Sequence, residues 1–323
     1  MSKWIMKCTL ALAALAAVLA SASAIGQGWP QRAVKVVVPF VAGGNTDNQA
    51  RIMSERVSAL MGQPFVIENR VGAGGAIAAE YVAKAPADGY TLFFAASPLF
   101  SLPYVQKVNY DPFKDFAPIS MIGTNAFVLG VHVSVPATTV KELVDYVKQR
   151  PGQLNYASGG TGSASHLAPA LFLVRAGLKM THIPYKGGAQ AVADLVGGQV
   201  QMQIGNASEL IQHSKSGKIR MLAVTSEKRT PQLPDLPAIA ETYPGFRIIT
   251  WNGYLAPAGT PKPIIDRLAQ VIIKVAHEAA TMVRLNNMGV DPLGNTPEEF
   301  ADYVRRDDAV WRAAVNAAGI KLE

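Results

Sequence analysis

The sequence has almost no cysteine. Cys8 is the only one among 323 residues, and it lies in the N-terminal segment. A disulfide needs two cysteines and a thiolate zinc site needs several, so neither is expected. Beyond that segment there is also no apolar run of the roughly 18 residues that a membrane-spanning helix requires. We therefore expect a soluble mature chain without disulfides or thiolate-bound metal.

Charged residues are also sparse. Asp, Glu, Lys and Arg together make up 16% of the chain, and the net charge is +7. The basic residues are scattered, apart from short pairs such as Lys228-Arg229 and Arg305-Arg306. A nucleic-acid-binding protein needs a clustered basic patch or stripe. The charge pattern therefore predicts no nucleic-acid partner.

Catalytic and metal-binding signatures are missing as well. The sequence contains no G-x-S-x-G elbow, no H-E-x-x-H and no P-loop. Its histidines stand apart, without the spacing of metal ligands: His132, His166, His182, His213 and His277. We therefore expect a protein that is not an enzyme and needs no cofactor or metal. One alternative stays open, an exported serine hydrolase with Ser163 as nucleophile and His166 as base.

The first residues have the pattern of a secretion signal. Lys3 and Lys7 precede an apolar run from Leu10 to Leu19, and Ala22-Ser23-Ala24 offers a small-x-small cleavage site. We expect residues 1–24 to be removed on export, and Cys8 with them. Export disfavours a ligand-sensing domain of a cytoplasmic regulator.

Short apolar runs alternate with helical patterns along the rest of the chain. Repeated strand–helix alternation predicts a parallel α/β sheet, and here it occurs twice without a flexible linker between the two series. We therefore expect two lobes that the chain crosses more than once, residues 25–122 with 227–323 and residues 123–226. Strands are expected at 34–40, 65–67, 91–95, 154–157, 181–183, 200–204 and 221–224, and helices at 48–61 and after Thr139, Thr260 and Thr296.

Two glycine-rich loops each follow a predicted strand and open a helix. Residues 39–47 contain Gly43 and Gly44, and residues 156–166 contain three glycines and four small hydroxyl side chains. Glycines let backbone N–H groups approach a ligand, and a helix N-terminus attracts anions. Such loops can hold a carboxylate without a nearby Arg or Lys. A tight turn is the other interpretation of each loop.

Two features near these loops favour structural roles. Asp47 can cap its helix or pair with Arg51 one turn later, and we weight that above ligand contact. Residues 72–75 do not complete a dinucleotide fingerprint, so we expect close backbone packing there.

An ordered series of motifs resembles the Bug-type receptors, the periplasmic solute-binding components of tripartite tricarboxylate transporters. The resemblance covers essentially the whole mature chain. The matching segments are Val38-Pro39-Phe40, Gly43-Gly44-x-x-Asp47, Glu68-Asn69-Arg70-x-Gly72-Ala73-Gly74-Gly75, Asp88-Gly89-Tyr90-Thr91-Leu92, Asp111-Pro112-x-x-Asp115-Phe116, Leu154-Asn155-Tyr156-Ala157-Ser158, His166-Leu167, Pro184-Tyr185-Lys186-Gly187, Gly217-Lys218 and Trp251-x-Gly253.

The resemblance implies a type II-like periplasmic binding protein, with two α/β lobes hinged around a cleft. It implies capture of a small carboxylate in the periplasm, delivery to membrane permease subunits, and a monomer. In the family, ordered waters help bridge a carboxylate to the loops. The implied ligand contacts are Phe40, Gly44, Thr46 and Asp47 in the near lobe, Ser158, Gly159, Thr161, Gly162, Ser163 and His166 in the far lobe, and Tyr185, Lys186, Gly187 and Asn206 on the far wall.

One position departs from the family pattern. Members often carry Asp before the Asn that ends the strand at 204–206, whereas this chain has Gly205. Loss of that carboxylate disfavours recognition of an amino group. We therefore hypothesise a mono- or dicarboxylate ligand without an ammonium group, aromatic or short aliphatic.

Overall fold

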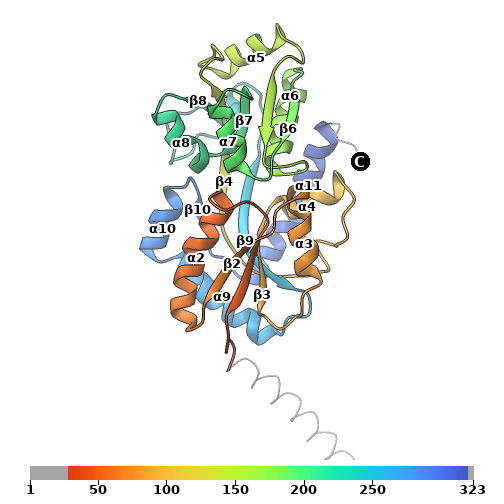
Figure 1. Ribbon diagram of the computed structural model, residues 1–323, viewed down its shortest axis with the longest axis vertical. Coiled ribbons are helices and arrows are strands. Elements are labelled where there is room, and N and C mark those ends of the chain that lie inside the picture. Colours follow the sequence, from red (N-terminus) through yellow and green to blue (C-terminus); the bar gives the residue numbers. More distant parts are fainter. Residues whose placement is uncertain (1–27, 319–323) are drawn as a thin grey trace, which may run out of the picture.

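The computed structural model describes residues 28–318, which form two lobes stacked along the long axis of the molecule (Figure 1). The expected leader, residues 1–24, lies outside the described residues. Among the residues described, no helix is long and apolar enough to cross a membrane. A mixed α/β architecture is present in both lobes, as the sequence predicts.

The lower lobe contains the beginning and the end of the described chain. Its parallel strands β2, β1 and β3 lie side by side, and β9 pairs antiparallel with β3. Its elements are β1 (Val34–Val38), α2 (Asn45–Met61), β2 (Phe65–Asn69), α3 (Ala76–Ala83), β3 (Thr91–Ala96), α4 (Pro98–Ser101), β9 (Ile249–Pro257), α9 (Lys262–Ala276), α10 (Ala279–Asn286), β10 (Asp291–Pro292) and α11 (Pro297–Ala318), with 3₁₀ turns at Ala73–Gly75 and Leu102–Tyr104.

The upper lobe is built from the middle of the chain. Strands β6, β5 and β7 are parallel neighbours, and helices separate them in sequence. Its elements are α5 (Val140–Lys148), β5 (Asn155–Ser158), α6 (Ala164–Ala176), β6 (Thr181–Pro184), α7 (Gly188–Val196), β7 (Met202–Asn206), α8 (Ala207–Lys215) and β8 (Ile219–Val224), with a 3₁₀ turn at Ile239–Glu241 on the way back.

One long strand, β4 (Phe116–His132), belongs to both lobes. Its first part, up to Ala126, pairs antiparallel with β9, and its last part, from Phe127, pairs antiparallel with β7 and β8. The strands therefore form one path in the order β2-β1-β3-β9-β4-β7-β5-β6. Each lobe has the expected parallel strands, and β4 and β9 add antiparallel pairs because they run against their neighbours.

Local sequence explains where the helices begin and end. Thr296 Oγ1 accepts the Glu299 N–H at 3.2 Å, and the Glu299 carboxylate accepts the Thr296 N–H at 2.9 Å, which is a complete capping box for α11. Thr139 accepts the Glu142 N–H in the same way at the start of α5. Gly62 ends α2 in the left-handed conformation, with φ 72°.

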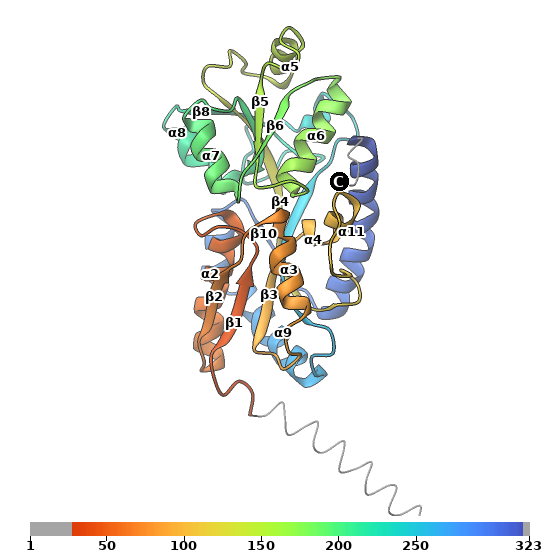
Figure 2. The ribbon, with the colours of Figure 1, turned by 45° about the vertical axis from the view of Figure 1, so that its right-hand side comes forward.

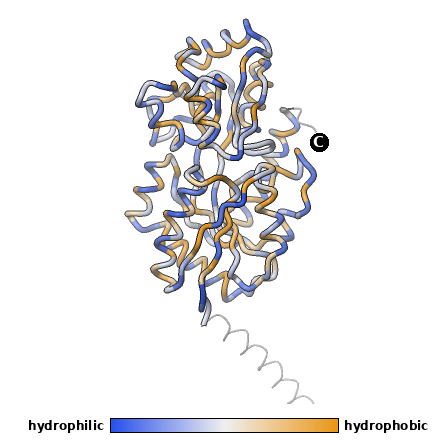
Figure 3. Tube along the Cα trace, viewed as in Figure 1, coloured by the Kyte–Doolittle hydropathy of each residue, from blue (hydrophilic) through white to orange (hydrophobic). Residues whose placement is uncertain are grey.

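The hydrophobic core lies along the strands and the helices packed against them. Hydrophobic stretches follow the central strands, whereas the outer helices alternate between hydrophobic and hydrophilic residues (Figure 3). The C-terminal helix α11 runs along one side of the molecule, and it contacts α6 of the upper lobe (Figure 2). Trp311 of α11 and Phe172 of α6 are both buried in the same core cluster. The two lobes therefore share packing beside the crossing strand.

Candidate functional site

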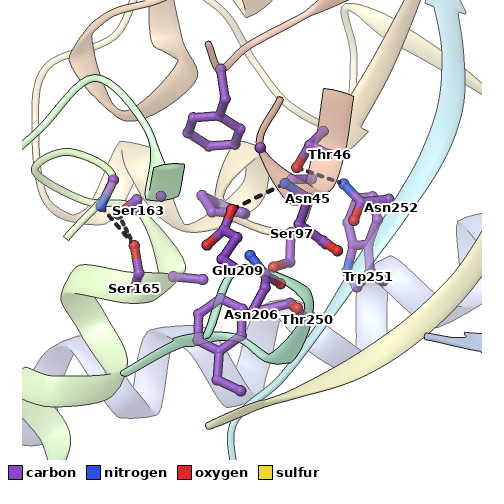
Figure 4. A pocket seen from close by; sticks show the side chains of 18 residues that line it. Asn45, Thr46, Ser97, Ser163, Ser165, Asn206, Glu209, Thr250, Trp251 and Asn252 are labelled. Atoms are coloured by element: carbon purple, nitrogen blue, oxygen red, sulfur yellow. Dashed lines mark hydrogen bonds between the residues drawn. The ribbon is translucent and has the colours of Figure 1, made fainter. Parts of the chain in front are cut away.

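A pocket of about 50 Å³ lies between the lobes, with walls from both (Figure 4). Its polar walls come from segments that follow strands β1, β3, β5, β6 and β7, and from β9 itself. The lining residues are Phe40, Gly44, Asn45, Thr46, Ala96, Ser97, Pro98, Phe127, Gly159, Ser163, Ala164, Ser165, Gly188, Asn206, Glu209, Thr250, Trp251 and Asn252.

Four helices of more than two turns begin at this pocket, beside the single-turn α4. The lining includes the first residues of α2 and α6, the first residue of α7, and Asn206, which caps α8. The first N–H groups of a helix have no partner within the helix, and the helix dipole makes this end positive. No lysine, arginine or histidine lines the pocket among the residues described. The site can therefore attract an anion through backbone dipoles and hydroxyl groups.

Asp47 holds the near-lobe loop from behind the pocket wall. Its carboxylate accepts hydrogen bonds from the Gly43 N–H at 2.9 Å, Asn69 Nδ2 at 2.8 Å and Arg51 Nε at 2.8 Å. Burial acts to raise the pKa of Asp47, but the bonds from Arg51, Gly43 and Asn69 together hold it below its usual value. The carboxylate thus orders the loop that presents Gly44 to the pocket.

The far-lobe loop is held by its own hydroxyl groups. Ser165 Oγ accepts the Gly159 N–H at 2.8 Å and pairs with Ser163 Oγ at 3.1 Å. Gly160 and Gly162 have φ of 130° and 75°, which residues with a Cβ rarely adopt. The glycines therefore allow the turn, and the serines face the pocket.

Two histidines stack beneath this loop. The rings of His166 and His182 lie 3.9 Å apart with an angle of 11° between them, and Tyr156 stacks on His182 at 5.0 Å. Burial lowers the pKa of His166 to about 4, and burial followed by the charge of His166 lowers that of His182 to about 3. Both rings are neutral at neutral pH. The expectation that the histidines stand apart is wrong for this pair, because the fold brings His166 of α6 against His182 of β6. Pairing of β5 with β6 also places Tyr156 opposite His182.

The geometry of Ser163 and His166 does not support the hydrolase alternative. His166 Nδ1 accepts the Gly162 N–H at 3.1 Å, and Ser163 Oγ pairs with Ser165 instead. The His166 N–H donates to the Ser163 carbonyl at 2.9 Å, but within residues 28–318 no hydrogen bond joins the Ser163 hydroxyl to the His166 ring. In the same part of the chain, no group of three His, Cys, Asp or Glu residues could hold a metal ion.

The sequence-predicted contacts divide into two groups. Those in the pocket wall are Phe40, Gly44, Thr46, Gly159, Ser163 and Asn206. Those outside the wall are Asp47, Ser158, Thr161, Gly162, His166, Tyr185, Lys186 and Gly187. Gly44 and Ser163, from opposite lobes, face the same cavity.

Most residues outside the wall support the loops. Ser158 Oγ lies 2.6 Å from His182 Nε2, and the Tyr185 hydroxyl bonds to Asp194 at 2.5 Å. Lys186 is exposed. A Cβ on Gly187 would lie 2.6 Å from a methyl group of Val41 in the other lobe, so this glycine permits close contact between the lobes.

Sequence reasoning missed the wall that β9 and α8 supply. Asn252 Nδ2 reaches Thr46 Oγ1 at 3.3 Å and the Ala95 carbonyl at 3.2 Å, which ties β9 to the near loop. Trp251 and Gly253 stand in a motif of the resemblance, which is the signal that could have pointed to this segment. Gly205 is not in the wall, and a Cβ there would meet the side chain of Gln203.

Glu209 is the ionisable side chain of the pocket wall. Its Oε1 accepts the N–H of Asn45, the first residue of α2, at 3.0 Å (Figure 4). Ser208 Oγ, from the same helix as Glu209, donates to Asn45 Oδ1 at 2.9 Å. Glu209 is half-buried as a residue, but its Oε2 is shut off from solvent and has no hydrogen-bond partner. These contacts join the lobes across the pocket.

The fold and site define a class, the two-lobed binding proteins that close over a small cavity. A model of the tripartite tricarboxylate transporter family receptor matches residues 49–320. The chain belongs to this family, as the motifs predict. Because this is a receptor family, the expectation that the chain is not an enzyme is confirmed.

Relatives of known name and structure agree with this assignment. BugT of Bordetella pertussis is 35% identical over 299 residues, which cover 91% of this chain and 92% of BugT. The structure of R. palustris Rpa4515 with adipate has a TM-score of 0.89 at 39% identity, covering 91% of this chain and all of that one. MatC from Rhodopseudomonas palustris with bound malate has a TM-score of 0.84 at 31% identity, with coverage of 89% and 100%.

Proposed function

We propose that this protein captures a small carboxylate between its lobes in the periplasm and delivers it, as a monomer, to the permease subunits of a tripartite tricarboxylate transporter. The observation that carries the proposal is the convergence of four helix N-termini on one pocket without a basic side chain. Backbone N–H groups and hydroxyls of this kind stabilise a carboxylate by charge-assisted hydrogen bonds.

Capture requires the lobes to part and close again. The pocket walls come from both lobes, so the full set of contacts exists only in the closed form. Binding then shifts the population toward closure, in proportion to the contacts that the closed form adds. Micromolar affinity corresponds to about −8 kcal/mol, which several charge-assisted hydrogen bonds can supply after ordering costs.

We further propose a plain mono- or dicarboxylate as the ligand. Two relatives are solved with adipate and with malate, and neither acid carries an amino group. Calorimetric titration with succinate, glutarate, adipate, malate and benzoate, beside aspartate and glutamate, tests this choice. Tight binding of an amino acid alone would contradict it, and absence of binding by any carboxylate would overturn the proposed function.

Ser163→Ala tests the far-lobe loop. Loss of a hydroxyl that bonds an anion is expected to weaken binding about tenfold or more, while the fold stays intact. Ser216→Ala, at an exposed serine outside the pocket, is the matched control. Equal affinities for the two variants, by calorimetry, would remove Ser163 from the site.

A further inference from the structure

Glu209 places an acidic group where an acidic ligand is proposed to bind. The first turn of α8 carries it into the pocket, and it is the ionisable member among the lining residues. Gly188 faces it from the other side, and a Cβ at Gly188 would lie only 2.1 Å from Glu209 Oε2. Because glycine has no side chain, position 188 leaves room for the carboxyl group of Glu209.

The two carboxyl oxygens of Glu209 differ. Oε1 accepts the Asn45 N–H at 3.0 Å, and Asn45 lies at the positive end of α2. Oε2 is buried and has no partner. A buried carboxylate oxygen without a donor is costly, and the same atom becomes a donor once it carries a proton. Oε2 is therefore the oxygen of Glu209 that still lacks a hydrogen-bond partner.

The acidic and imidazole groups around Glu209 do not supply a positive charge. Asp47 on α2 is itself ion-paired with Arg51. On the far-lobe side, His166 and His182 are neutral at neutral pH, because burial lowers their pKa to about 4 and about 3. These groups leave the charge of Glu209 uncompensated.

The basic groups nearby stay outside the pocket. Lys186, on the loop before α7, is exposed, and the basic residues of α8 itself, His213 and Lys215, lie in its last turn. The strands contribute neutral amide and hydroxyl groups. These are Asn206, Thr250 and Asn252. A ligand carboxylate entering this pocket thus meets a second carboxylate and no basic side chain among the lining residues.

We infer that closure around the ligand takes up one proton, and that Glu209 holds it and donates it from Oε2 to the ligand carboxylate. This inference rests on the proposed function. With the lobes apart, water reaches the carboxyl group and it is ionised at neutral pH. In the closed form, burial raises the pKa of Glu209 although Asn45 and Asn206 act to lower it, and a second carboxylate beside it raises the pKa further. Two carboxylates in such a site keep one proton between them.

Calorimetry of plain diacids tests the proton uptake directly. Adipate, glutarate and succinate are dianions at pH 8 with no hydrogen-bond donor of their own, so any proton must come from solution. Titration in phosphate and in Tris, which differ in ionisation enthalpy, gives the number of protons taken up. We expect about one proton per ligand for the wild type, and a Kd that rises about tenfold per pH unit between pH 7 and 8.

Glu209→Gln supplies the matched variant. Glutamine keeps an oxygen for the Asn45 N–H and offers an NH₂ donor to the ligand, so it should bind adipate without proton uptake and more tightly than wild type at pH 8. Glu227→Gln, at an exposed glutamate, should behave as wild type. Wild-type binding of these diacids without proton uptake, and with a pH-independent Kd, would overturn the inference. Failure of both wild type and Glu209→Gln to bind any carboxylate would overturn the proposed function instead.

Discussion

Single residues decide how the pocket is presented. Asp47 is 1% exposed and does not line the cavity, yet three separate donors hold its carboxylate. His166 and His182 act in the same way beneath the far-lobe loop, where His166 Nδ1 accepts the Gly162 N–H and His182 Nε2 pairs with the Ser158 hydroxyl. The residues that hold the loops are therefore distinct from those that face the ligand.

Asp47→Asn is expected to lower the free energy of unfolding by about 1–3 kcal/mol at pH 7, because a buried charged acceptor loses its bonds from Gly43, Arg51 and Asn69. The pKa of Asp47 is lowered in the folded protein. Its contribution is therefore present above the unfolded value of about 3.9, and it is lost as the pH falls through the folded pKa. Urea unfolding from pH 7 to pH 3 measures this difference.

Asp266→Asn is the control for Asp47→Asn. Asp266 also forms an i,i+4 ion pair, with Lys262, but both side chains are largely exposed. Its removal should cost well under 1 kcal/mol. Similar losses for the two variants, or a loss for Asp47→Asn that does not diminish between pH 7 and pH 3, would speak against a buried structural carboxylate at position 47.

Two thirds of the pocket wall, 12 of its 18 residues, could not be predicted residue by residue. The two loops could be found because a strand followed by glycines and a helix start is a local pattern, and the family resemblance implied Gly44, Thr46, Gly159 and Ser163 within them. Glu209 gave no such pattern, since it is an ordinary glutamate in the first turn of a helix. It reaches Asn45, 164 positions away in sequence, only through the closure of the lobes.

At the scale of helices and strands, capping chemistry determines several boundaries. The complete capping box at Thr296 starts α11, the helix that lies against both lobes. Most short strands and the capped helices follow from apolar runs and caps in the sequence. The strands β4 and β9 did not, because Pro118, Gly123 and Gly130 interrupt the apolar pattern of β4, and pairing between distant segments determines both.

Thr296→Ala is expected to lower the free energy of unfolding by about 1 kcal/mol, because the Glu299 N–H loses its acceptor. Thr139→Ala removes the equivalent cap from α5 and should cost a similar amount. Denaturant unfolding of both variants provides the measurement. Only Thr296→Ala should also alter ligand affinity, since α11 contacts both lobes and α5 lies at the far end of the upper lobe (Figure 1). Unchanged stability in both would contradict the capping roles.

At the scale of the whole molecule, closure depends on glycines where the lobes meet. Gly74 of the lower lobe has φ 64°, and a Cβ there would lie 2.4 Å from the Thr161 carbonyl oxygen of the upper lobe. This contact accounts for the glycine-rich segment at 72–75, where close backbone packing is expected from the sequence. The lobe boundaries at 122/123 and 226/227 stay a prediction.

Gly74→Ala is expected to keep the lobes from closing fully, because the new methyl group collides with the Thr161 carbonyl. Ligand affinity should fall at least about tenfold, or about 1.4 kcal/mol. Small-angle X-ray scattering with saturating adipate should give a larger radius of gyration than for wild type. Gly62→Ala, with φ 72° and no atom within 4 Å of the new Cβ, controls for backbone strain alone. Equal affinity for these two variants would show that the contact does not limit closure.

Because β4 passes through both lobes, the two lobes can complete their sheets only at different times during synthesis. The upper lobe closes its sheet with residues 127–224, which emerge as one continuous stretch. In the lower lobe β3 pairs early with β1, but it gains its second neighbour only when β9, at residues 249–257, has been made, and α9 covers that sheet later still. The first-made half of the chain therefore carries an unpaired strand edge until β9 has been synthesised, which is the interval when chaperones have most to protect.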